Sequence, residues 1–183
     1  MAKSSPLERI PANTNIVQQY LIIFIISSSS VIGQNYRPDW VVGFGGINYD
    51  NGYSLTYDNS GNIYLVGRFS GGVDFDPSPS IDSIISNGLM DVFISKYDTS
   101  GNYKWTISIG GNSDDYAYGI TSDLNGDILI TGYFEGSCDF DPSLNNAITN
   151  SFGGRDAYIA KYDSNGEFVW AKRLGGAGSD QGY

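Results

Sequence analysis

Residues 156–176 read DAYIAKYDSNGEFVWAKRLGG, and residues 91–111 read DVFISKYDTSGNYKWTISIGG. The two stretches lie 65 positions apart. Placing residues 40–104 on residues 105–169 without a gap gives 25 identities in 65 positions. Trp40, Trp105 and Trp170 share the same spacing. A fixed period of this kind indicates a fold in which one supersecondary unit is used several times.

Each repeat contains four runs of alternating apolar and polar residues, joined in pairs by turns of the form Asp-x-x-Gly. Such runs predict strands, and Asp and Gly favour the tight turns of hairpins. The strands predicted in the later copy are 118–122, 128–134, 156–162 and 168–174, and those in the earlier copy are 53–57, 63–69, 91–97 and 103–109. Four antiparallel strands per period, with no helix between them, are typical of one β-propeller blade.

The predicted fold class is therefore all-β, a partial β-propeller made of four-stranded antiparallel blades. Residues 49–109 and 114–174 are predicted as two complete blades. Residues 34–48 are predicted as a linker and a lone closing strand, Trp40 to Phe44, and residues 175–183 as the start of a truncated third blade. Because propellers need about four to eight blades to close, we expect the chain to be a fragment of a longer product.

Residues 1–33 have the order of features found in a secretory signal peptide. Lys3 and Arg9 precede the apolar run 21–26, and small residues follow up to Gly33, where cleavage is predicted. This pattern predicts a secreted or cell-surface protein, although a disordered leader or a wrongly assigned start codon is the alternative. The apolar run is too short to span a bilayer, so no membrane insertion is expected after the leader is removed.

Composition excludes several classes of function. The net charge is −10, from 10 basic and 20 acidic residues, which argues against nucleic acid as a partner because phosphate backbones are bound by clustered Lys and Arg. Histidine is absent, so the chain cannot supply a Ser-His-Asp triad. Cys138 is the single cysteine, which excludes an internal disulfide, and it is predicted to be a small buried apolar residue.

Three motifs resemble the SBBP-type β-propeller repeats of bacterial exported proteins. They are residues 119–132 (GITSDLNGDILITG), residues 156–163, and Trp170 followed by Gly175 and Gly176. The element Asp-Phe-Asp-Pro-Ser, at 74–78 and 139–143, resembles a variant from Bacteroidetes-like bacteria. The resemblance covers residues 40–183 and implies a seven-bladed propeller, which at this period needs roughly 455 residues. It implies no shared reaction.

No metal site is assigned, and the same Asp-x-Asp elements are the leading candidates for one. Asp74 with Asp76, and Asp139 with Asp141, place two carboxylates in a proline-containing loop, and calcium prefers such oxygen ligands. The alternative is that these aspartates cap backbone N–H groups in the loop. Apart from possible calcium, no cofactor is expected.

The leading functional hypothesis is a non-enzymatic exported module that binds a protein or a glycan, or that serves as a scaffold. The alternatives are a fragment of a propeller hydrolase or lyase whose active site lies in other blades, and a calcium-stiffened adhesin segment. No catalytic residue is assigned. Two positions differ in character between the copies: Arg68 is replaced by Tyr133 one period later, and Arg155 stands where the earlier copy has Met90. Neither arginine is expected to form a cluster. Uncovered blade faces and strand edges predict that the isolated chain self-associates.

Overall fold

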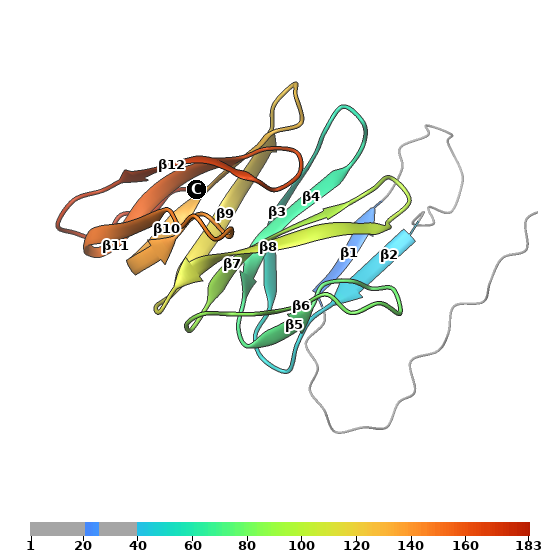
Figure 1. Ribbon diagram of the computed structural model, residues 1–183, viewed down its shortest axis with the longest axis horizontal. Coiled ribbons are helices and arrows are strands. Elements are labelled where there is room, and N and C mark those ends of the chain that lie inside the picture. Colours follow the sequence, from blue (N-terminus) through green and yellow to red (C-terminus); the bar gives the residue numbers. More distant parts are fainter. Residues whose placement is uncertain (1–20, 26–39) are drawn as a thin grey trace, which may run out of the picture.

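The computed structural model describes residues 21–25 and 40–183, and every regular element in them is a β-strand (Figure 1). The strands are β1 (Leu21–Ile25), β2 (Trp40–Phe44), β3 (Asn51–Tyr57), β4 (Ile63–Phe69), β5 (Gly72–Asp74), β6 (Ser83–Ile85), β7 (Asp91–Tyr97), β8 (Tyr103–Gly111), β9 (Asp115–Ser122), β10 (Ile128–Asp139), β11 (Ile148–Tyr162) and β12 (Phe168–Leu174). All pairs between these strands are antiparallel. The all-β, antiparallel part of the prediction is thus confirmed, and no sheet in this part of the chain closes on itself.

The strands form two units with the same plan. In the first unit, β3, β4, β7 and β8 pair in that order, and in the second unit β9, β10, β11 and β12 do the same. The units join where β8 pairs with the far end of β10, Gly110 with Asp139 and Gly111 with Cys138. The excursion between the second and third strands is a separate hairpin, β5–β6, in the first unit. In the second unit it is a continuation of β10 and β11 beyond an irregularity between Glu135 and Ser137.

The predicted leader falls mostly outside the described residues. Only Leu21–Ile25 of residues 1–33 is described, as β1, and it pairs along its whole length with β2, from Leu21 opposite Phe44 to Ile25 opposite Trp40. The predicted cleavage after Gly33 therefore stays a prediction. Residues 21–25 and 40–183 contain no helix with the length and apolar character needed to cross a membrane.

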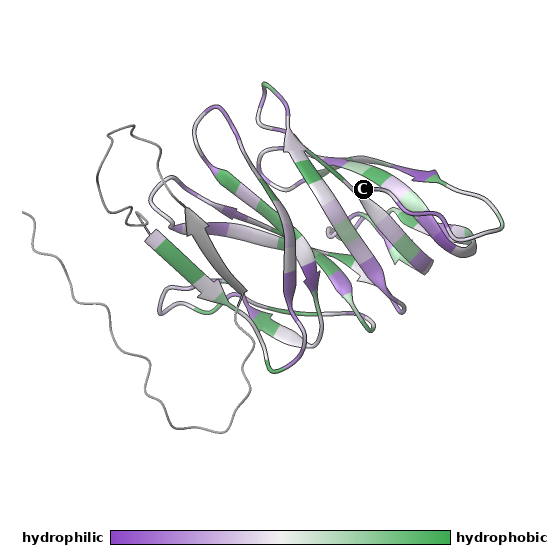
Figure 2. Cartoon of the chain, turned by 180° about the vertical axis from the view of Figure 1, so that it is seen from behind, coloured by the Kyte–Doolittle hydropathy of each residue, from purple (hydrophilic) through white to green (hydrophobic). Residues whose placement is uncertain are grey.

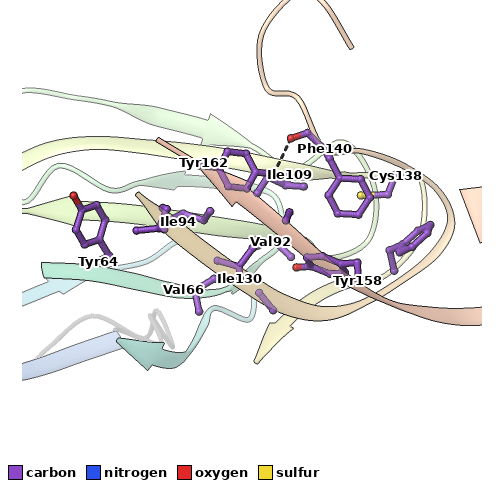
Figure 3. Packing of buried hydrophobic residues seen from close by; sticks show 14 residues of the cluster. Tyr64, Val66, Val92, Ile94, Ile109, Ile130, Cys138, Phe140, Tyr158 and Tyr162 are labelled. Atoms are coloured by element: carbon purple, nitrogen blue, oxygen red, sulfur yellow. Dashed lines mark hydrogen bonds between the residues drawn. The ribbon is translucent and has the colours of Figure 1, made fainter. Parts of the chain in front are cut away.

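The core consists of two clusters that are one period apart. The first lies between β2 and the first unit and contains Val42, Phe44, Leu65, Phe69, Val73, Phe75, Phe93 and Tyr97. The second lies between the two units (Figure 3). It includes residues 65 positions later, namely Ile109, Ile130, Phe134, Cys138, Phe140, Tyr158 and Tyr162, and Ile107 packs against it. One packing interface is thus used twice, and the prediction that Cys138 is buried is confirmed.

The repeated interface includes a repeated hydrogen bond. The Tyr162 hydroxyl donates to the Phe140 carbonyl at 2.7 Å (Figure 3), and the Tyr97 hydroxyl donates to the Phe75 carbonyl at 3.1 Å. Both tyrosines are fully buried, so each hydroxyl needs a partner. The bond fixes the Asp-Phe-Asp-Pro loop to the third strand of its own unit.

The first unit is covered on both faces, whereas the second unit is covered on one. Five consecutive residues are buried in each of β4 and β7, because odd positions face β2 and even positions face the second unit. In β12, by contrast, no residue is buried. Apolar and polar bands alternate along the strands, as half-covered sheets require (Figure 2).

The repeated tryptophans cover turn glycines of the following repeat. Gly101, at φ +81°, and Gly166, at φ +85°, each end an Asp-x-x-Gly turn. A Cβ on Gly101 would lie 2.7 Å from the ring of Trp40, and one on Gly166 would lie 3.2 Å from the ring of Trp105. The positive φ and the ring together explain why both residues recur at a fixed spacing.

Candidate functional site

Three tyrosines at equivalent positions of successive repeats lie in a row. Tyr53 is on β3, Tyr118 is on β9, and Tyr183 occurs at the same spacing of 65 residues. Their ring centroids are 5.2 Å apart in both neighbouring pairs. Tyr53 is 39% exposed and Tyr183 is 84% exposed. The row is therefore a partly exposed aromatic surface rather than part of the core.

Two arginines lie on this surface. The rings of Tyr116 and Tyr133 stack with centroids 4.6 Å apart. The guanidinium of Arg68 lies 4.2 Å from the centroid of Tyr116, and that of Arg155 lies 4.6 Å from the centroid of Tyr133. We call this set the tyrosine–arginine cluster; its members are Tyr53, Arg68, Tyr116, Tyr118, Tyr133, Arg155 and Tyr183.

The prediction that Arg68 and Arg155 form no cluster is wrong. Arg68 lies at an even position of β4, on the face that packs against the second unit, and so it reaches Tyr116 on β9. Tyr133 occupies the position of Arg68 one period later. A comparison of the two copies therefore shows that these residues differ, but it does not show that both belong to one cluster. A signal was available in the sequence: Arg68 lies near the end of the predicted strand 63–69, and Arg155 lies just before the predicted strand 156–162.

Burial favours the neutral form of two tyrosines of the cluster, Tyr53 and Tyr133. Burial raises the pKa of Tyr53, against the lowering effect of the Arg68 charge, and burial likewise raises the pKa of Tyr133 against that of Arg155. Arg68 Nε donates to Asn51 Oδ1 at 3.2 Å, and Arg155 Nε lies 3.5 Å from Glu135 Oε2 with both side chains more than a third exposed. Tyr133 is only 2% exposed, so the arrangement offers a ligand the rings of Tyr53 and Tyr183 and the two partly exposed guanidinium groups.

The predicted metal candidates lie in the two Asp-Phe-Asp-Pro loops, where they cap backbone groups. Asp74 Oδ1 accepts from the N–H groups of Asp76 and Asp82 at 3.2 and 3.0 Å, and Asp76 Oδ1 accepts from that of Ser78 at 2.9 Å. Asp139 and Asp141 repeat these contacts 65 residues later. In residues 21–25 and 40–183, no three Asp, Glu, His or Cys side chains gather as metal ligands would. Calcium binding at these four aspartates stays a prediction.

Asp139 and Asp141 also line a groove between the units. It consists of two adjoining hollows of about 400 and 470 Å³ that share Ile107, Asp141, Pro142 and Ser143. Asp139 lines the first hollow, and Glu167 lines the second. We call these two hollows the acidic groove. The residue-level prediction had found its aspartates but not the cavity beside them.

A pair of buried carboxylates lies at the crossing from β8 to β9, and sequence reasoning missed it. Asp91 and Asp115 are 0% and 1% exposed. Asp91 Oδ2 accepts from the N–H of Asn87, and Asp115 Oδ2 accepts from that of Gly111, both at 2.8 Å, while each Oδ1 is buried without a hydrogen-bond partner. Burial, with the charge of Asp91, raises the pKa of Asp115 to about 8. The recurrence of aspartate at 50, 115 and 180, and at 91 and 156, was the available signal.

Comparison with known proteins supports the repeat architecture. No family model matches the chain. The chain is 28% identical over 114 positions to an uncharacterised WD repeat-containing protein of Acanthamoeba polyphaga mimivirus. The matched part is 54% of this chain and 8% of that protein. The chain is also 28% identical over 121 positions to the regulatory protein FlaEY of Caulobacter vibrioides, and the matched part is 66% of this chain and 12% of that protein.

The chain thus spans about a tenth of the length of the curated relatives that it matches. The repeated antiparallel units and the likeness to a WD-repeat protein together indicate a β-propeller-like repeat protein. Proteins of this architecture offer broad surfaces for binding.

Proposed function

We propose that this chain is part of a non-enzymatic β-propeller, with the first and second units as two blades of the SBBP type, and that it binds a protein partner through the tyrosine–arginine cluster. The observation that carries the proposal is the placement of Arg68 and Arg155 on the stacked rings of Tyr116 and Tyr133. A glycan is the competing ligand.

The composition of the cluster favours a protein. Tyr and Arg are enriched among the few residues that carry most of the binding energy in protein interfaces. Tyr offers a large, rigid contact area at low entropic cost, and the guanidinium groups add directional donors. The likeness to a WD-repeat protein points to the same kind of role.

Export and ring completion belong to the same proposal. Cleavage after Gly33 would remove β1 and leave the edge of β2 free, so that β2 could pair with strands of a further blade. N-terminal sequencing of the mature protein from culture supernatant tests the export step. A protein that is retained in the cell with an intact N-terminus would contradict it.

Photo-crosslinking tests the binding site. We place p-benzoylphenylalanine at Tyr53, inside the cluster, or at Leu124, an exposed turn position that is 88% exposed, and expose the chain to extract from its native host. We expect a distinct adduct only from position 53, and we expect the partner purified from it to bind about tenfold more weakly to Arg68→Ala. Lys172→Ala is the control, because Lys172 is an exposed basic residue of β12 that does not belong to the cluster. Equal affinity of the Arg68→Ala variant would refute the site.

A further inference from the structure

The outer edge of β8 is open in the middle of the strand. β8 pairs with β7 from Tyr103 to Ile109, and it pairs with β10 only at Gly110 and Gly111. Over Trp105–Ile109, β7 is therefore the sole strand partner in the described part of the chain. In an antiparallel pair, every second residue directs its N–H and C=O away from the partner, so this stretch offers unpaired backbone groups to another strand.

The acidic groove lies over this open edge. The hollow of about 400 Å³ is lined by Thr106, Ile107 and Ser108 of β8, with Ile84 and Ile85 of the first unit on one side and the Asp141–Ser143 loop of the second unit on the other. The hollow of about 470 Å³ continues past Ile107 to Phe168. An extended chain laid along β8 would thus have apolar contacts from both units.

The charge of the groove has one sign. Asp139, Asp141 and Glu167 are the charged residues among those that line the two hollows. Asp139 and Asp141 use Oδ1 to hold the N–H groups of their own loop, which leaves Oδ2 of each for a ligand. A groove of this kind attracts ammonium and guanidinium groups, and the net charge of −10 reinforces the attraction.

We propose that the acidic groove binds an extended basic segment of another protein, which adds as a strand to the edge of β8. Its backbone pairs with β8 between Trp105 and Ile109, its Lys or Arg side chains meet Asp139 and Asp141, and its alternate apolar side chains contact Ile84, Ile85 and Ile107. Strand addition of this type takes affinity from backbone hydrogen bonds and specificity from alternate side chains. The site lies on the fourth strand of the first unit, and it is independent of the tyrosine–arginine cluster.

The test uses a fluorescein-labelled peptide of three Lys-Val repeats and measures its anisotropy with the full chain. We expect saturable binding at 50 mM NaCl, weaker binding at 500 mM NaCl, and no binding of the matching Glu-Val peptide. The double variant Asp139→Asn with Asp141→Asn keeps the side-chain oxygens that cap the loop, and it should raise Kd about tenfold. The matched control is Asp74→Asn with Asp76→Asn, one period earlier and outside the residues that line the groove, which should leave Kd unchanged.

Backbone methylation separates strand addition from simple charge attraction. Two Lys-Val peptides carry N-methyl groups on alternate residues, one on the Lys and one on the Val positions. Because only one edge of an added strand faces β8, we expect one methylated peptide to lose binding and the other to keep it. Equal binding of both, equal binding by the aspartate double variant, or binding of the Glu-Val peptide would each overturn the proposal. Thermal melting confirms that every variant compared is folded.

Discussion

Asp115 is a buried carboxylate in the described part of the chain whose pKa is raised. It is 1% exposed, it shares the crossing with Asp91, and one oxygen of each carboxylate has no partner. At the equivalent crossing one period later, Arg173 Nη1 lies 3.5 Å from Asp156 Oδ2. Among the described residues no Lys or Arg makes such an ion pair with Asp91 or Asp115. A buried charge without a counter-charge is costly, so the pair favours a protonated form.

We expect the chain to lose stability as the pH rises towards 8. Burial raises the pKa of Asp115 to about 8, whereas an unfolded aspartate has a pKa of about 3.9. The folded state therefore keeps a proton that the unfolded state releases. The stabilisation that Asp115 contributes is complete below pH ~4, and it is lost as the pH rises through the pKa of Asp115 in the folded state. Burial raises the pKa of Asp91 in the same direction. Urea unfolding at pH 5 and pH 8 should show a fall of about 3–4 kcal/mol in the free energy of unfolding.

The variant Asp115→Asn should reduce this fall, because its amide is neutral and can still accept from the Gly111 N–H. Asp58→Asn is the control. Burial opposes ionisation of Asp58, but hydrogen bonds from Asn62, Tyr64 and Ser60 lower its pKa, so it is ionised in both states between pH 5 and pH 8. Its loss should lower stability equally at the two pH values. A wild-type slope that persists in Asp115→Asn would show that another group is responsible.

At the residue scale, sequence reasoning worked where the copies agree and failed where they differ. Cys138 was predicted as buried because its counterpart is Val73, and both are buried. Arg68 and Tyr133 occupy the same place in consecutive copies, so no comparison of copies shows that they belong to one cluster. Neighbours across a unit boundary depend on which face of the strand meets the next unit, and that follows only once the packing is known.

At the scale of the element, the crossing from β8 to β9 depends on a glycine pair in close contact with its surroundings. A Cβ on Gly110 would lie 2.5 Å from the Asp91 carboxyl carbon, and one on Gly111 would lie 1.7 Å from the Ser137 carbonyl oxygen. Gly111 pairs with Cys138, one of the two residue pairs that join β8 to β10. The glycine pair thus permits the close approach that connects the units.

Gly111→Ala should therefore destabilise the chain by about 2–4 kcal/mol, since backbone rather than a movable side chain opposes the new methyl group. Gly176→Ala is a matched control exactly one period later, where a Cβ would meet nothing within 4 Å, and it should change stability by less than about 0.5 kcal/mol. Thermal unfolding followed by tryptophan fluorescence measures both. Similar melting temperatures for the two variants would contradict the role given to the β8–β10 contact.

Most strands could be predicted because the Asp-x-x-Gly turns between them can be recognised in the sequence. The strands predicted at 63–69, 91–97 and 168–174 coincide with β4, β7 and β12, each of which is bounded on one side by an Asp-x-x-Gly turn. The excursion between the second and third strands was predicted as a loop, whereas it contains β5 and β6 in the first unit and the ends of β10 and β11 in the second. Its pairing is not set by a short turn, so the sequence carries little signal for it.

At the scale of the whole molecule, the two faces of the second unit differ. One face packs on the first unit through the core. The other carries Leu129, Ile159 and Trp170, which lie on one side of the sheet by the register of β10, β11 and β12. Tyr183 covers part of this face above a hollow of about 420 Å³ that Leu129 and Ile159 line. The same register also places Lys161 and Lys172 on this face. The equivalent face of the first unit is buried by the second unit, which makes this surface a candidate interface in spite of the two lysines.

We therefore expect the isolated chain to self-associate through this face. Sedimentation velocity between about 1 and 100 µM should show dimers or larger species that increase with concentration. Ile159→Lys with Leu174→Lys adds two charges to the same face, where Leu174 is 50% exposed, and it should shift the chain to monomer because an unpaired charge in an apolar interface is costly. Leu124→Lys, at a turn and 88% exposed, is the control and should leave association unchanged. A wild-type chain that stays monomeric across the whole range would show that the segment ending at Tyr183 covers the face well enough alone.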